Sequence, residues 1–253
     1  MVLVLGIEVE PDLVARWRNW LMPAVQPFVV PGELAAKRGW VEDRERLTFE
    51  VLDAFELYGT AGSQAIVWLT RQQARSLPAA TRQAQPAPHR WPTGRIERDL
   101  STVVRYVERG RRASRHHEIS DQQWSTAANV LPDARQLAGT FASSSGPNCF
   151  STVMAAAGVT DATDEWMQVG PFEQWLEKAT APGGSDGQPG TVLVWRDDAG
   201  VPAHAAVTIG AGWFLHKPSQ GWMSPRLVLN IQDGKYSVRH PGLRLHRRQI
   251  TQG

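Results

Sequence analysis

Cysteine is almost absent from this sequence, since Cys149 is the only one among 253 residues. A lone cysteine cannot form a disulfide within the chain, so the fold must be stabilised by a buried core. Apolar residues make up 42% of the chain, which is enough for one large domain or for two smaller ones.

Long apolar runs and a strong charge of one sign are also lacking. No stretch of about 18 or more apolar residues occurs, so we expect no membrane-spanning helix. The 27 Lys and Arg residues nearly balance the 25 Asp and Glu residues, and the net charge of +2 gives no field that would attract nucleic acid or an anionic membrane. We therefore expect neither nucleic acid nor a membrane as a partner.

The first residues of the sequence lack the features of an export signal. Residues 1–10 contain no basic residue and no small-residue cleavage site. Together with the lone cysteine, this favours a reduced, cytoplasmic location.

Clusters with the spacing of metal ligands are missing as well. His116 and His117 are adjacent, so their side chains point in different directions, and no partner with ligand spacing is near them. The basic run that they end, residues 109–117, is typical of a solvated helix end rather than of a phosphate site. We therefore expect no metal and no cofactor.

The pattern of apolar residues and prolines divides the chain into two parts. Residues 1–83 combine strand-like and helix-like runs, with a strand expected over residues 1–9, and we interpret them as a small α/β region of unknown role. Residues 84–95 contain three prolines, which exclude a helix or a central strand, so we place a linker there. Residues 96–253 then form the main domain, which begins with helices expected at 96–108 and 120–130.

The segment around Cys149 contains a candidate for a catalytic nucleophile. A loop of small and turn-forming residues ends at Cys149, and an Ala-rich run that Gly158 can close follows it, which predicts a helix that begins near the cysteine. A thiol at a helix N-terminus lies at the positive end of the macrodipole, which favours the thiolate, and the free N–H groups of the first turn can hold an oxyanion. Cys149 is therefore a candidate nucleophile, and a buried thiol that only packs is the alternative.

Four residues around this segment are candidates for contact with a substrate. They are Ser145, Asn148, Phe150 and Trp195. The serines before Cys149 do not lie in a Gly-x-Ser-x-Gly elbow, so a cleft wall is a better interpretation of them than a serine nucleophile.

Two histidines fall on a later β-hairpin. Residues 201–209 alternate between an apolar face and a face that holds His204, and residues 210–212 turn the chain into a second strand that holds His216. A three-residue loop places the two histidines diagonally on one face, whereas a two-residue loop places them on opposite faces. With the three-residue loop, the pair supplies a base and an orienting group for Cys149.

The sequence pattern around residues 233 and 234 predicts further antiparallel strands. Asp233 and Gly234 stand between two alternating runs, which is a typical hairpin signal. We therefore expect the sheet to end in a meander with a structural role.

Taken together, these segments resemble the NlpC-type branch of the papain-like cysteine peptidases. The resemblance covers about residues 137–218 and rests on Leu137-Ala138-Gly139-Thr140, on the strand Pro189-Gly190-Thr191-Val192-Leu193-Val194-Trp195, on His204 within Ala-His-Ala-Ala-Val-Thr-Ile-Gly, and on His216 after Gly-Ala-Gly. It implies an α+β, papain-like fold in which the nucleophile-bearing helix packs on an antiparallel sheet. It also implies that Cys149 is the nucleophile, that His204 is the general base and later the acid, and that His216 holds His204 in the required tautomer.

One departure from the family affects the expected substrate. The family usually has Asp-Cys-Ser-Gly at the nucleophile, where this chain has Asn148-Cys149-Phe150-Ser151. The missing carboxylate points away from binding of a substrate amine and from cell-wall peptide cleavage. We therefore expect a cysteine-dependent hydrolase that acts on a small-molecule or peptide amide or thioester. An acyltransferase that uses an amine acceptor and a catalytically silent binding module are the alternatives.

Overall fold

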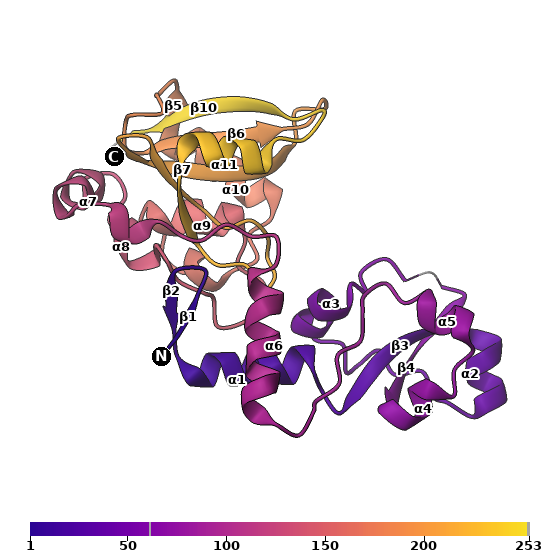
Figure 1. Cartoon of the computed structure of the whole chain (residues 1–253). Coiled ribbons are helices and arrows are strands. Elements are labelled where there is room, and N and C mark those ends of the chain that lie inside the picture. The colour runs from indigo at the N-terminus through magenta and orange to yellow at the C-terminus, as the bar shows by residue number, and fades with distance from the viewer. Residues whose placement is uncertain (61, 252–253) are drawn as a thin grey trace. The chain divides into compact units, whose positions relative to one another are not determined.

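The computed structural model describes residues 1–60 and 62–251, and it has a mixed α+β fold with antiparallel sheets (Figure 1). It separates into two compact units. The first contains residues 1–2 and 9–109, and the second contains residues 3–8 and 110–253. Within the described part of the chain, no helix is both long enough and apolar enough to cross a membrane.

The first unit is built around a two-stranded antiparallel sheet. Its elements are α1 (Pro11–Leu21), β3 (Val25–Pro31), α2 (Gly32–Arg38), α3 (Phe49–Phe55), β4 (Gln64–Thr70), α4 (Arg71–Arg75), α5 (Ala79–Gln83) and α6 (Ile96–Glu108). In this sheet, Val29 of β3 lies opposite Ile66 of β4. Both strands are edges, which is why β3 can contain Pro27 without losing a central ladder bond.

The proline-rich residues 84–95 belong to this first unit and pack along β3. The Gln85 side chain accepts a hydrogen bond from the Val29 N–H at 2.9 Å and donates one to the Val29 carbonyl oxygen at 2.8 Å. The Gln26 side chain donates to the Arg90 carbonyl oxygen at 2.7 Å. Proline excludes regular secondary structure here, but it does not exclude a packed segment held by side-chain hydrogen bonds.

Helix α6 has the bounds that its apolar period predicts, but it also belongs to the first unit. Its Asp99 is fully buried and pairs with Arg18 of α1 at 3.0 Å. The division between the units therefore falls after Arg109 and not at residues 84–95, because this buried pair and the α1–α6 packing hold the helix to the first unit.

The second unit contains a six-stranded antiparallel sheet in the order β5-β10-β6-β7-β8-β9. Its strands are β5 (Thr180–Pro182), β6 (Thr191–Arg196), β7 (Pro202–Gly210), β8 (Trp213–His216), β9 (Leu227–Asn230) and β10 (Arg244–Ile250). Its helices are η1 (His116–Glu118), α7 (Asp121–Ala128), α8 (Ala134–Leu137), α9 (Cys149–Ala156), η2 (Ala162–Asp164), α10 (Val169–Ala179) and α11 (Ile231–Val238). Strands β6 to β9 form a meander, and β10 returns to the other side of β6.

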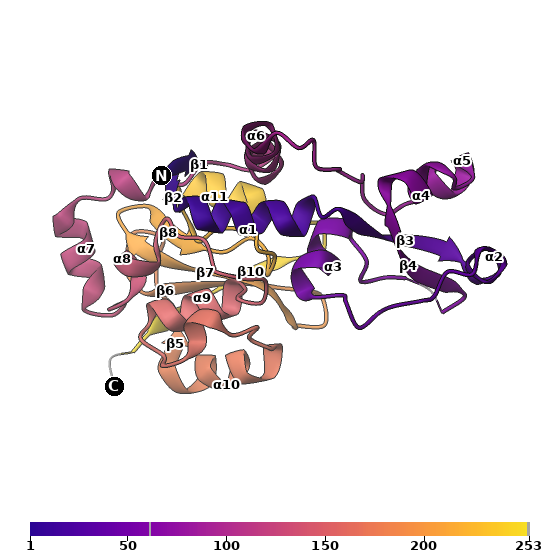
Figure 2. The ribbon, with the colours of Figure 1, turned by 90° about the horizontal axis from the view of Figure 1, so that it is seen from below.

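The two faces of this sheet carry different helices. Figure 2 shows α9 and α10 on one side of the sheet and α11 on the other. The main core lies on the α9 side, where Val194, Ala205, Val207 and Leu215 pack with Val153 of α9. This arrangement decides which side chains of β7 and β8 can face the nucleophile helix.

The strand expected over residues 1–9 is interrupted. Strands β1 (Val2–Val4) and β2 (Ile7–Val9) pair as a hairpin whose turn residues, Leu5 and Gly6, have positive φ angles of 52° and 74°. The Leu5 carbonyl oxygen accepts a hydrogen bond from the Ser114 N–H at 2.8 Å, which ties this turn to the start of the second unit's longer segment.

The hairpin expected at Asp233 and Gly234 is wrong, because both residues lie in helix α11. The Asn230 side chain caps this helix by accepting a hydrogen bond from the Asp233 N–H at 2.9 Å. The glycine at position 234 allows the backbone of α11 to pack closely on Phe214 and does not form a turn, since a Cβ at this position would lie 1.7 Å from the Phe214 ring.

We expect Gly234→Ala to destabilise the protein, because the added methyl group overlaps the fully buried Phe214 ring. Overpacking of this kind costs about 1–3 kcal/mol, which urea unfolding would measure. Gly170→Ala in α10 is the matched control, since a Cβ there meets no atom within 4 Å and alanine favours a helix. Equal stability of the two variants would contradict the packing of α11 on Phe214.

Candidate functional site

The turn between β7 and β8 sets the position of the two histidines. It has only two loop residues, Ala211 and Gly212, so the three-residue loop expected from the sequence is wrong. A β-bulge between Thr208 and Gly210 inserts one extra residue before the turn and restores the register, so that Val207 lies opposite Leu215. The bulge and the two-residue loop together therefore place His204 and His216 on one face, as a three-residue loop would.

His204 and His216 lie on one face of the sheet and contact each other. Nε2 of His204 lies 3.2 Å from Nδ1 of His216, and the two rings meet edge to face with centroids 5.4 Å apart. The contact expected from the register is therefore confirmed. In this bond one ring nitrogen donates and the other accepts.

Burial keeps both imidazoles neutral. Burial lowers the pKa of His204 to about 4. Burial also lowers the pKa of His216 well below its ordinary value, and a charge on His204 would lower it further. At neutral pH the pair is therefore uncharged, which is the form in which a histidine can accept a proton.

Cys149 is the first residue of helix α9, as the sequence predicts. Asn148 caps the helix, and its side-chain oxygen accepts a hydrogen bond from the Ser151 N–H at 3.0 Å. The Ser151 hydroxyl accepts one from the Asn148 N–H at 2.8 Å in return. This reciprocal capping fixes the start of the helix and thereby the position of the thiol.

The electrostatic environment of Cys149 differs from the one that its position in the helix predicts. Burial raises the pKa of the thiol to about 11, and this effect outweighs the backbone N–H groups and the positive charge of Lys217, which act in the opposite direction. The start of the helix favours the thiolate as expected, but the net result is the opposite, because Cys149 is only 8% exposed and desolvation dominates.

The thiol lies next to the strand that carries His204. The N–H of Ala205, the residue that follows His204, lies close enough to the sulfur to lower the pKa of the thiol. The Ala205 side chain belongs to the core on the α9 side, and alternation directs the His204 side chain to the other face. Among the described residues no hydrogen bond joins Cys149 to either imidazole. Nε2 of His204 is bonded to His216, so Nδ1 is the ring nitrogen of His204 that takes no part in this bond.

Of the four candidate substrate-binding residues, only Trp195 lies beside the histidines. It stands opposite His204 in the β6–β7 ladder, with ring centroids 5.6 Å apart. The other three have contacts within the fold. Phe150 stacks on Phe172 at 4.3 Å, the Ser145 hydroxyl accepts from the Trp222 N–H at 3.1 Å, and the Asn148 amide donates to the Met167 carbonyl oxygen at 2.8 Å.

Lys217 is a site residue that the sequence analysis did not identify. It is fully buried, and its ammonium group donates to the carbonyl oxygens of Ser219 at 2.6 Å and Gly221 at 3.1 Å. The signal that was available is its place directly after His216, because alternation puts successive residues of a strand on opposite faces.

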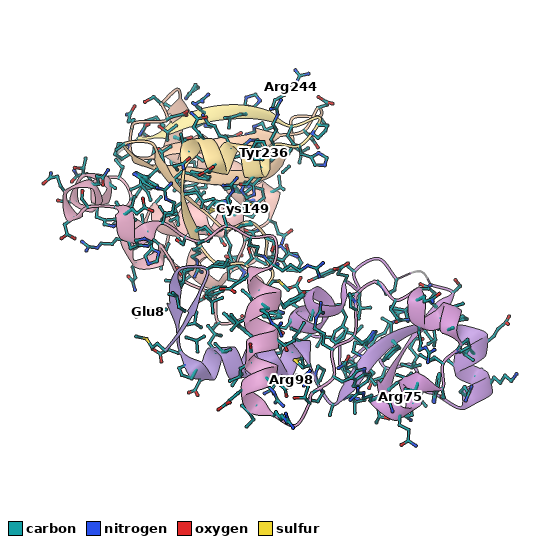
Figure 3. All side chains as sticks on the ribbon, viewed as in Figure 1. Glu8, Arg75, Arg98, Cys149, Tyr236 and Arg244 are labelled. Carbon is teal, nitrogen blue, oxygen red and sulfur yellow. The ribbon has the colours of Figure 1, made fainter. Side chains whose placement is uncertain are left out.

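A cavity of about 480 Å³ lies beside the histidine pair. Its lining residues are Gly110, Arg111, Arg112, His204, His216, Pro218, Leu227, Leu229, Tyr236, Ser237 and Val238. Figure 3 labels Tyr236 on α11 and Cys149 on α9. Cys149 is not among the residues that line this cavity.

In the described residues, no three His, Cys, Asp or Glu side chains are grouped as metal ligands. Comparison with protein-family models, with curated proteins and with solved structures gave no match.

We expect the protein to lose stability between pH 7 and pH 4.5 through His204. Its pKa in the folded state is below its pKa in the unfolded chain, so the neutral form contributes fully above about pH 6.5 and its contribution is lost as the pH falls. The shift corresponds to roughly 2–3 kcal/mol at pH 4.5. Urea unfolding across this range should show a shallower pH dependence for His204→Gln than for the unaltered protein, whereas parallel curves would contradict the buried neutral histidine.

Proposed function

We propose that the second unit is a cysteine-dependent enzyme of the papain-like kind that hydrolyses an amide or a thioester. The observation that carries this proposal is the position of the Cys149 sulfur against the N–H of Ala205, one residue from an imidazole that a second imidazole holds. In this proposal α9 supplies the nucleophile, β7 the base and β8 the orienting group. Because alternation places the His204 imidazole on the face of β7 opposite the thiol, proton transfer requires one of these two side chains to change position. The helix that packs its N-terminal cysteine on an antiparallel sheet also supports the papain-like assignment.

In the first step, Nδ1 of His204 takes the thiol proton as the sulfur attacks the substrate. The electron pair of the Cys149 sulfur forms a bond to the substrate carbonyl carbon, and the C=O electron pair moves to the oxygen. The free N–H groups in the first turn of α9 are the donors available for this oxyanion. As the tetrahedral intermediate collapses, the C–N or C–S bond breaks and the leaving group takes the proton from His204.

Water then resolves the thioester on Cys149. His204 removes a proton from the water as its oxygen attacks the carbonyl carbon, and the carboxylic acid leaves as the thiol is restored. In both half-reactions Nδ1 must start without a proton, so the proton of neutral His204 must lie on Nε2 and point to Nδ1 of His216.

The buried setting makes proton transfer simultaneous with attack. The thiol has a pKa of about 11 and His204 a pKa of about 4, so a thiolate–imidazolium pair does not form in the resting protein. The charge of Lys217 lowers the pKa of Cys149, and it would stabilise the thiolate as it develops.

An acyltransferase is the second candidate, and the burial of the thiol favours it. Because Cys149 is only 8% exposed, water has little access to the acyl-enzyme, and an amine bound beside it can take the acyl group instead. The steps are those given above, with the amine nitrogen in place of the water oxygen.

We expect iodoacetamide to alkylate Cys149 slowly in the native protein at neutral pH and faster as the pH rises towards 11, because the thiolate is the reactive form. His204→Gln should slow the reaction at neutral pH by about tenfold or more, since it removes the base. His240→Gln is the matched control, because His240 is exposed and far in sequence from β7. If Cys149 is alkylated only after denaturation, the result contradicts the enzyme and favours a catalytically silent binding module.

Intact-mass measurement with a panel of activated esters and thioesters tests the acyl-enzyme itself. We expect an acyl adduct on the unaltered protein and none on Cys149→Ser under the same conditions, since the alcohol is a far weaker nucleophile. Loss of the adduct in water indicates the hydrolase, and loss only after addition of an amine indicates the acyltransferase. No adduct across the panel would argue against both enzymes.

A further inference from the structure

The outer nitrogen of His216 lacks a partner. Its Nε2 atom is buried, and within the described part of the chain it makes no hydrogen bond. The whole residue is 2% exposed, and its imidazole lines the cavity beside the histidine pair. A buried polar atom without a partner is costly, so this atom identifies a place where a ligand would be stabilised.

The tautomer required for catalysis determines what kind of partner is missing. For Nδ1 of His204 to accept the thiol proton, Nε2 of His204 must donate to Nδ1 of His216. Neutral His216 then carries its own proton on Nε2. The atom without a partner is therefore a donor, and it needs an acceptor oxygen.

The cavity favours an anionic acceptor with an apolar tail. Arg111 and Arg112 line it, and none of the described residues that line it is acidic. Arg112 also pairs with Asp233 at 3.0 Å, but both side chains are partly exposed. Of the two residues, only Arg112 lines the cavity. Leu227, Leu229 and other apolar side chains form the remaining wall.

We propose that this cavity binds a small monocarboxylate, one oxygen of which accepts the hydrogen bond from Nε2 of His216. The carboxylate is a co-ligand and not the acyl donor, because Cys149 does not line the cavity. It extends the chain of hydrogen bonds by one member, because His216 already occupies the place beside the base that a carboxylate has in a Cys-His-Asp arrangement. The donor role of Nε2 and the catalytic consequence both rest on the proposed function: by fixing the proton on Nε2 of His216, the ligand also fixes His204 in the tautomer whose Nδ1 is the base.

Titration calorimetry with butyrate tests the binding site directly. We expect saturable binding at one site, and no binding of butylammonium, which has the same tail and the opposite charge. Arg112→Gln should weaken the affinity for butyrate by about tenfold, the loss expected for one charge-assisted contact. Asp233→Asn is the matched control, since it breaks the same ion pair but leaves the arginine in place, and its affinity should be unchanged or higher.

Nitrogen NMR of protein labelled in its histidines gives a second readout. Butyrate should shift the His216 signals to those of the Nε2–H tautomer, with assignment from His216→Gln, and it should accelerate alkylation of Cys149 by iodoacetamide several-fold. Lack of saturable butyrate binding, equal binding of butylammonium, or binding that leaves the His216 signals unchanged would overturn the proposal. Cys149→Ser separates it from the proposed function, because butyrate should bind this variant equally well even if Cys149 forms no acyl-enzyme.

Discussion

The hydrogen bond between His204 and His216 depends on one extra residue in β7. The loop between β7 and β8 alone would direct the two imidazoles to opposite faces, and the bulge between Thr208 and Gly210 compensates for it. The same register places Ala205 on the α9 side, where its N–H reaches the sulfur of Cys149. The candidate site therefore rests on a local irregularity of the sheet, and removal of that one residue would exchange the faces of the whole strand.

Burial acts on Cys149, His204 and His216 in the same direction, towards the neutral form. It raises the pKa of Cys149 and lowers the pKa values of His204 and His216. The capped start of α9 and the charge of Lys217 oppose this effect at the sulfur without overcoming it. In such an environment the thiol and the imidazoles stay neutral until a bound substrate or ligand stabilises their charged forms.

Much of this arrangement could be predicted from local sequence signals. The start of α9 at Cys149, the bounds of α6 and the strands with His204 and His216 follow from caps and apolar periods. The predicted length of the β7–β8 loop is wrong because of a local bulge, whereas the other failures depend on contacts with residues distant in sequence. Gly234 lies in a helix since it packs on Phe214, and residues 84–95 join the first unit because Gln85 bonds to β3. The thiol's high pKa likewise reflects burial, which no local pattern around Cys149 reveals.

The second unit is discontinuous in the chain, since residues 3–8 belong to it and residues 9–109 form the first unit before it resumes. The hydrogen bond from the Ser114 N–H to the Leu5 carbonyl oxygen spans this insertion. During synthesis from the N-terminus, more than a hundred further residues must be added after Leu5 before Ser114, its hydrogen-bond partner, is present. The first unit can fold within that interval, and its folding brings the two ends of the insertion together and shortens the effective loop that the second unit has to close.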